Sequence, residues 1–110
     1  MSKRKEATDI PLEVRLEVWE RDDHKCIFCK RYVGVACANA HYIKRSQGGL
    51  GIPQNIGTAC PLCHREEDAG KNTGLYRELF RKYLSSQYSD WDETKLYYKK
   101  GMDLDERLQN

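Results

Sequence analysis

Four of the five cysteines of the chain form two pairs with the spacing of metal ligands. Cys26 and Cys29 make one C-x-x-C pair, and Cys60 and Cys63 make a second pair after 30 intervening residues. A two-residue gap lets both thiolates of a pair face one tetrahedral ion, and four thiolates leave no coordination position for water. The sequence therefore predicts a structural Zn²⁺ site and not a catalytic one.

Two disulfides or four buried thiols are the alternatives to zinc. The start of the chain, Met1 to Glu6, is charged and no apolar segment follows it, so no secretory signal and a reducing compartment are expected. The longest apolar run, residues 35–38, is far too short to span a membrane. Thiols in a reducing compartment hold metal far more often than they form disulfides.

We interpret the fifth thiol, Cys37, as a core residue in an apolar strand, because no paired base is near it in sequence.

Acidic residues are absent from the middle of the chain. The whole chain has 19 Lys and Arg against 17 Asp and Glu, but no acid occurs between His24 and Arg65. The basic residues of this segment are Lys25, Lys30, Arg31, Lys44, Arg45 and Arg65. An electropositive segment favours a polyanion such as nucleic acid, since phosphate contacts supply affinity independent of sequence. The alternative is a solvated surface on which charges cluster by chance.

Two of the three histidines lie in this acid-free segment. His41 precedes a basic, glycine-rich loop, and His64 directly follows Cys63, which would fix it near the start of a helix. Asp68 lies four residues after His64 and would share its helix face. Such a pair could hold a divalent cation with open positions for a substrate, or form a simple hydrogen bond on the helix surface.

A chain of 110 residues has room for one domain. Pro11 suits a helix start, and the apolar spacing after it predicts a helix over residues 11–21. We expect a hairpin from residues 33–35 and 38–43. Further helices are expected over 62–70 and from residue 75, with a short helix in the last stretch. The expected divisions are a flexible basic arm (1–10), a zinc-bearing domain (11–87) and an aromatic, charged extension packed on that domain (88–110).

Several of these residues together resemble the HNH endonuclease family, in its small zinc-bearing form found in phages and prophages. The resemblance spans residues 11–70 and is carried by the two cysteine pairs, the run Ala40 to Gly49 (AHYIKRSQGG), Asn55 and His64. It implies an α+β domain of the ββα-metal type, treble-clef-like around a structural zinc held by four cysteines, with an N-terminal helix and additional C-terminal helices.

The family pattern also implies roles for individual residues. His41 matches the general base that activates water, and Asn55 matches the asparagine that holds the loop and orients the base. His64 matches a ligand of the catalytic metal, and Asp68 stands where many members have a second ligand on the helix. The position before the base usually carries Asp or His as a metal ligand, but here it is Ala40.

The expected function is therefore a DNA endonuclease of the bacterial cytoplasm that depends on a catalytic Mg²⁺, Mn²⁺, Ni²⁺ or Zn²⁺. Lys44 and Arg45 would grip phosphates beside the cut. Ala40 favours an alternative, a zinc-bearing DNA-binding module without catalysis. A third possibility is an interaction protein of a phage packaging machine that uses the aromatic tail. A monomer is the default expectation.

Overall fold

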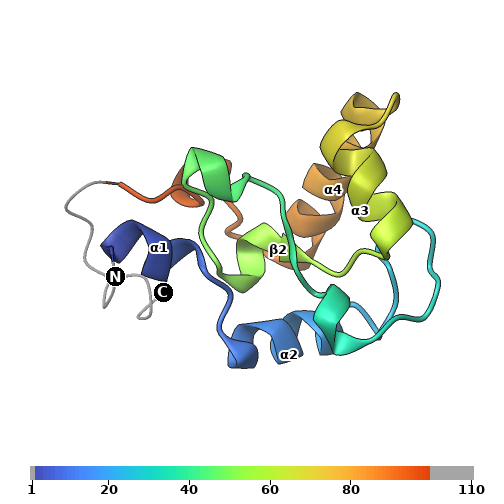
Figure 1. The fold of residues 1–110 in the computed structure, drawn as a ribbon, viewed down its shortest axis with the longest axis horizontal. Coiled ribbons are helices and arrows are strands. Elements are labelled where there is room, and N and C mark those ends of the chain that lie inside the picture. Colours follow the sequence, from blue (N-terminus) through green and yellow to red (C-terminus); the bar gives the residue numbers. More distant parts are fainter. Residues whose placement is uncertain (1, 100–110) are drawn as a thin grey trace.

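The structure, a computed structural model, describes residues 2–99 of the chain (Figure 1). It is a small α+β fold in which helices surround one two-stranded sheet. The α-helices are α1 (Lys3–Thr8), α2 (Leu12–Arg21), α3 (Pro61–Ala69) and α4 (Thr73–Gln87), and the strands are β1 (Ala40–His41) and β2 (Ile56–Gly57). Short 3₁₀ turns are η1 (Val35–Cys37), η2 (Arg45–Gln47), η3 (Pro53–Asn55) and η4 (Glu93–Lys95). No helix within residues 2–99 is long and apolar enough to cross a membrane.

The strands pair differently from the expected hairpin. β1 and β2 are antiparallel, with Ala40 opposite Gly57 and His41 opposite Ile56. The expectation that residues 33–35 pair with 38–43 is wrong, because the backbone of Val33 closes the loop around the first cysteine pair by donating to the His24 carbonyl at 2.9 Å. Residues 35–37 then tighten into η1, which also places Cys37 in a half-buried turn and not in a strand.

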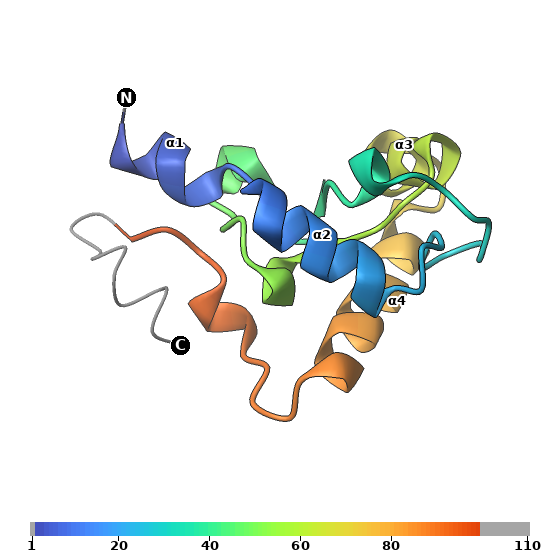
Figure 2. The ribbon, with the colours of Figure 1, turned by 90° about the horizontal axis from the view of Figure 1, so that it is seen from below.

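The predicted helix over residues 11–21 is confirmed as α2. Val18 is fully buried against Ala38 and Ile56, and Val14 and Trp19 pack at the edge of this contact. Leu12 and Leu16, which share the apolar spacing, are instead exposed to solvent. Helix α2 thus covers the sheet with the face that contains Val18 (Figure 2).

Helices α3 and α4, both predicted, pack against each other on one side of the fold (Figure 1). The fully buried Phe80 of α4 meets Phe28 and Tyr42 edge to face, with ring centroids 5.7 and 5.5 Å away. A Cβ at Gly57 would lie 2.8 Å from the Phe80 ring, so glycine lets the helix approach β2. This packing joins the strand pair to the two helices in one core.

In the stretch expected to be a flexible arm (1–10), the described residues include a short helix. Residues 3–8 form α1, which begins at Ser2, whose side chain accepts a hydrogen bond from the Lys5 backbone at 3.1 Å. Ala7 is fully buried, and its carbonyl accepts from the Gly51 N–H at 3.0 Å. The sequence of this helix has no apolar periodicity. The helix lies against the loop that follows β1, which holds it in place (Figure 2).

The described part of the extension, residues 88–99, lies on the body of the domain. The Trp91 indole donates to the Gln54 carbonyl at 2.8 Å, and Leu96 is buried. The Leu96 carbonyl accepts from the Leu50 N–H at 2.9 Å. Residues 100–110 of the expected extension lie outside the described residues.

Candidate functional site

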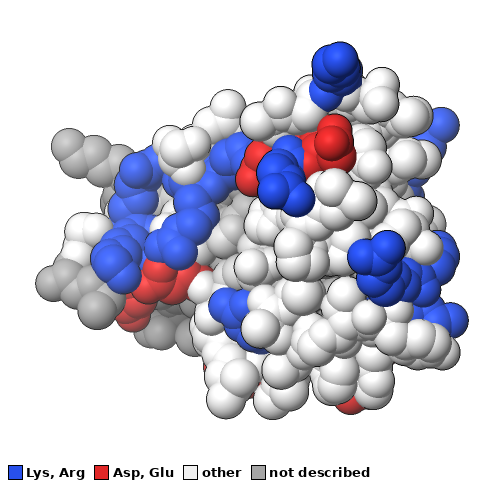
Figure 3. Space-filling model, turned by 45° about the vertical axis from the view of Figure 1, so that its right-hand side comes forward, with Lys and Arg blue, Asp and Glu red and all other residues white. Residues whose placement is uncertain are grey.

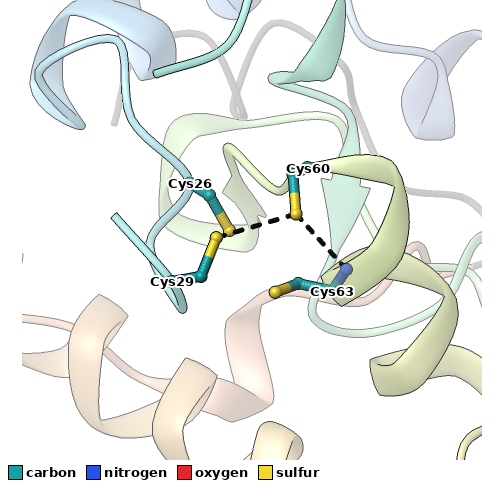
Figure 4. A group of neighbouring side chains, drawn as sticks. All are labelled: Cys26, Cys29, Cys60 and Cys63. Atoms are coloured by element: carbon teal, nitrogen blue, oxygen red, sulfur yellow. Dashed lines mark hydrogen bonds between the residues drawn. The ribbon is translucent and has the colours of Figure 1, made fainter. Parts of the chain in front are cut away.

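The four paired cysteines converge on one point, as their spacing predicts (Figure 4). Their sulfur atoms all lie within 4.8 Å of one another, and Cys29 is the one member exposed to solvent. Cys29 Sγ lies 3.8 Å from Cys60 Sγ, which also accepts the Cys63 N–H at 3.4 Å. This donor set and its closeness fit a single structural metal ion.

Backbone hydrogen bonds build the two cysteine turns and join them. The Cys26 N–H donates to the Arg31 carbonyl at 2.8 Å, and Lys30 adopts a left-handed conformation with φ 67°, which folds the first turn back on itself. The second turn places Cys60 as the N-cap of α3, with Pro61 as its first residue. Ile27 N–H donates to the Thr58 carbonyl at 2.9 Å and so ties the first turn to the approach of the second.

The four thiols differ in their tendency to ionise. Burial opposes ionisation of Cys60, but the Cys63 N–H and the neighbouring thiols outweigh it and lower the Cys60 pKa to about 7. Burial raises the pKa of Cys26 and of Cys63. The N–H groups at the start of α3 thus favour a thiolate at Cys60, the form that binds metal.

His41 of β1 is buried and held through one ring nitrogen. Its Nε2 lies 2.8 Å from the Thr8 carbonyl oxygen, and because a carbonyl only accepts, Nε2 carries the proton. Burial lowers the His41 pKa; the Thr8 carbonyl opposes this, while the positive charges of Arg45 and Lys44 add to it. His41 is therefore neutral at pH 7 and its Nδ1 is the basic nitrogen.

Asn55 lies at the junction of η3 and β2 and is fully buried. Its Oδ1 accepts the Ile43 N–H at 2.8 Å, and its Nδ2 donates to the carbonyls of Ile43 and Leu50 at 3.2 and 2.9 Å. These bonds hold both ends of the loop over residues 43–50 that follows β1. Gly49 completes the closure, because a Cβ there would lie 1.6 Å from the Ile43 carbonyl oxygen.

His64 and Asp68 lie on one face of α3, as their spacing predicts. His64 Nε2 is 3.6 Å from Asp68 Oδ2, a separation at which both atoms can ligate one ion. His64 is also near enough to His41 for its charge to lower the His41 pKa. Ala40, by contrast, is fully buried in the apolar core and offers no donor. Two protein ligands fit an ion whose remaining positions are filled by water and substrate.

A third ligand for such an ion does not emerge from the described part of the chain. Within residues 2–99 the cysteines are the one group of three or more His, Cys, Asp or Glu side chains close enough to share an ion. Within the described residues, His64 and Asp68 therefore form a pair of potential ligands and not part of a larger ligand cluster.

Lys44 and Arg45, expected to grip phosphates, are paired with acids in the structure. Lys44 Nζ lies 2.7 and 2.5 Å from the two carboxylate oxygens of the fully buried Glu67 and also contacts Asp68. Arg45 pairs with Asp9. In Figure 3, several Lys and Arg side chains on this face have Asp or Glu side chains directly beside them.

Sequence reasoning missed Thr8, Asp9 and Glu67 as neighbours of the site. All three lie outside the acid-free segment or at its edge, and folding returns them to it from both sides. No local pattern marks Thr8, because it acts through its backbone carbonyl. The spacing of Glu67, three residues after His64, could have indicated its place, because residues three apart share a helix face. A helix that directs His64 toward β1 also brings Glu67 near the segment that follows β1.

Comparisons of the chain with protein-family models, with curated proteins and with solved structures find no match. The resemblance to HNH endonucleases accordingly depends on the sequence pattern of this chain alone.

Proposed function

We propose that this protein is a DNA endonuclease of the HNH type that hydrolyses phosphodiester bonds with the help of a divalent metal ion. One observation carries the proposal. A buried, neutral His41 is locked by Thr8 so that Nδ1 is its basic nitrogen, and a separate His64–Asp68 pair lies on the adjacent helix. A fixed imidazole beside a two-ligand cation site is the minimum equipment for metal-assisted hydrolysis of a phosphodiester.

In this proposal His41 is the general base. Its Nδ1 accepts a proton from the attacking water, and the Thr8 carbonyl stabilises the imidazolium that results by accepting from Nε2–H. Asn55 keeps the loop over residues 43–50, which follows His41, closed. It thereby helps to fix the direction in which the His41 ring faces. Burial keeps His41 unprotonated and ready to accept.

His64 Nε2 and Asp68 Oδ2 would hold the catalytic Mg²⁺, Mn²⁺, Ni²⁺ or Zn²⁺. When bound, the ion supplies positive charge to the scissile phosphate and its leaving oxygen. The four cysteines would hold a separate structural Zn²⁺ that sets the start of α3 and thereby the position of His64. Because Ala40 offers no ligand, water and the phosphate itself would complete the coordination.

Lys44 and Arg45 remain the proposed phosphate contacts, with DNA oxygens taking the place of Asp68 and Asp9 as their partners. The exposed Arg31 and Arg65 belong to the same acid-free segment and extend the positive surface. Binding through such residues would depend on salt and little on base sequence. The protein would act on DNA in the cytoplasm of a bacterial cell, where its cysteines stay reduced.

A zinc-bearing DNA-binding module without catalysis is the second candidate. Two observations favour it: Ala40 offers no ligand, and the Lys44 ammonium contacts Asp68, one of the two residues that would bind the ion. A role as an interaction protein of a phage packaging machine would instead require no contribution from His41.

Cleavage of supercoiled plasmid tests the proposal. The purified protein is incubated with plasmid and Mg²⁺, Mn²⁺ or Ni²⁺, and nicked and linear products are counted for the wild type, His41→Ala and His24→Ala. His24 is a matched control because it is a histidine on the surface, paired with Glu20 at 2.9 Å. Cleavage by the wild type and His24→Ala but not by His41→Ala supports the nuclease. Binding without cleavage under every metal supports the non-catalytic module.

A further inference from the structure

The N-terminal helix α1 contacts the catalytic histidine directly. The Thr8 carbonyl at its last residue accepts the His41 Nε2–H at 2.8 Å, although the two residues are 33 positions apart in sequence. We propose that the segment over residues 3–9 is a positioning element, and Thr8 a positioning residue, that selects the His41 tautomer with a free Nδ1. The inference rests on the proposed function for its catalytic consequence, but the tautomer itself can be measured without any reaction.

A neutral imidazole in water exchanges its one proton between two nitrogens. Only one of the two tautomers leaves Nδ1 free to accept a proton from water. The backbone carbonyl of Thr8 cannot donate, so its contact with Nε2 is satisfied solely when Nε2 is protonated. His41 is 7% exposed, so water competes little for this bond.

Helix α1 does not hold this position by its own stability, because six residues are too few for a stable isolated helix. Three contacts dock it on the loop after β1. The Gly51 N–H donates to the Ala7 carbonyl at 3.0 Å, Arg4 Nη2 donates to the Ser46 carbonyl at 3.0 Å, and Asp9 pairs with Arg45. Orientation of His41 is therefore linked to docking of α1 (Figure 2).

Docking requires a glycine at position 51. A Cβ at Gly51 would lie 1.9 Å from the Asp9 carbonyl oxygen, and this atom belongs to the backbone of the segment that leaves α1. Gly51→Ala must therefore push this segment away from the loop. Gly34→Ala is the matched control, because a Cβ there meets nothing within 4 Å and the backbone φ of −78° is ordinary.

The test combines histidine ¹⁵N NMR with single-turnover plasmid cleavage. In the wild type and in Gly34→Ala we expect the His41 ring at neutral pH to be the Nε2-protonated tautomer. In Gly51→Ala the ring should become a mixture of tautomers. The chemical step should then slow by about 10- to 100-fold, as on losing an orienting partner, with little change in KM for DNA.

A second variant covers the case in which Gly51→Ala does not fold. Arg4→Ala/Asp9→Ala removes the side-chain contacts of α1 and leaves the loop backbone intact, and it should give the same two changes. An Nδ1-protonated His41 in the wild type overturns the inference. The inference is also overturned if both Gly51→Ala and Arg4→Ala/Asp9→Ala keep the wild-type tautomer. It is overturned as well if these variants show mixed tautomers but cleave at the same rate as Gly34→Ala. If the wild type cleaves nothing, the proposed function fails, and the tautomer ratios alone decide whether α1 positions the ring.

Discussion

Lys44 Nζ lies 2.7 Å from Oε1 of Glu67, a carboxylate with no exposure to solvent. The lysine comes three residues after His41, and the glutamate comes three residues after His64. This ion pair therefore joins the strand segment that carries one histidine to the helix that carries the other. Arg77 Nη1, 3.7 Å from Glu67, gives a weaker second partner.

Removal of the lysine should destabilise the fold. Lys44→Met leaves the buried Glu67 charge with Arg77 alone, which we expect to cost about 3 kcal/mol in the free energy of unfolding. Lys44→Met/Glu67→Gln should recover much of this loss, because no buried charge remains. Urea unfolding measures both, with Lys71→Met, on an exposed lysine, as the control. A loss for Lys44→Met no greater than for Lys71→Met would show that the pair does not stabilise the protein.

One tightly bound zinc per chain should be needed for folding. Cys60→Ser removes the ligand that caps α3, so the metal should be lost and the fold with it, because a small domain gains much of its stability from such a site. Elemental analysis and circular dichroism measure the two effects. Cys37→Ser is the matched control, since Cys37 lies outside the cluster. A folded, metal-free Cys60→Ser protein would contradict the assignment.

Stability should depend on pH through His41. Burial lowers its pKa in the folded state, so the unfolded chain binds this proton more tightly. The contribution of neutral His41 to the free energy of unfolding is fully present above its pKa in the unfolded chain, about 6.5. This contribution is lost as the pH falls from there toward the lower pKa of the folded state. Urea midpoints between pH 5 and 8 should fall less on acidification for His41→Gln than for the wild type. His24→Gln should behave as the wild type does, and an equal fall for His41→Gln would refute this assignment.

A carboxylate at position 40 should destabilise the protein. From the sequence, Ala40→Asp is expected to restore a metal ligand and increase cleavage at limiting metal. The structure places Ala40 among buried apolar side chains, where an unpaired carboxylate costs at least about 3 kcal/mol. Thermal unfolding should therefore show a large loss for Ala40→Asp and little for Ala36→Asp, on an exposed alanine. Equal stability of the two variants would mean that position 40 opens toward the site.

Local spacing explains what could be predicted from the sequence. The cysteine pairs, the His64–Asp68 pair and helices α2, α3 and α4 each depend on residues close together in the chain. The partner of β1 could not be predicted in the same way, because Ile56 and Gly57 pair with it across a loop held by buried hydrogen bonds of Asn55.

Long-range contacts account for the main errors. Helix α1 lacks an apolar pattern, and its order comes from docking on the loop near Gly51. Lys44 and Arg45 lie in a segment without acids, yet Glu67 and Asp9 return to them in the fold. Charge along a sequence therefore overstated the free positive charge at this site.

Single-turnover cleavage measured against metal concentration tests the central claim most directly. Loss of the proposed general base in His41→Ala should lower the maximal rate by about 10²- to 10⁴-fold while the metal concentration for half-maximal rate stays near that of the wild type. His64→Ala should instead need much more metal, because it removes one of the two proposed ligands. If His41→Ala cleaves at the wild-type rate at every metal concentration, the protein is not a nuclease of this kind.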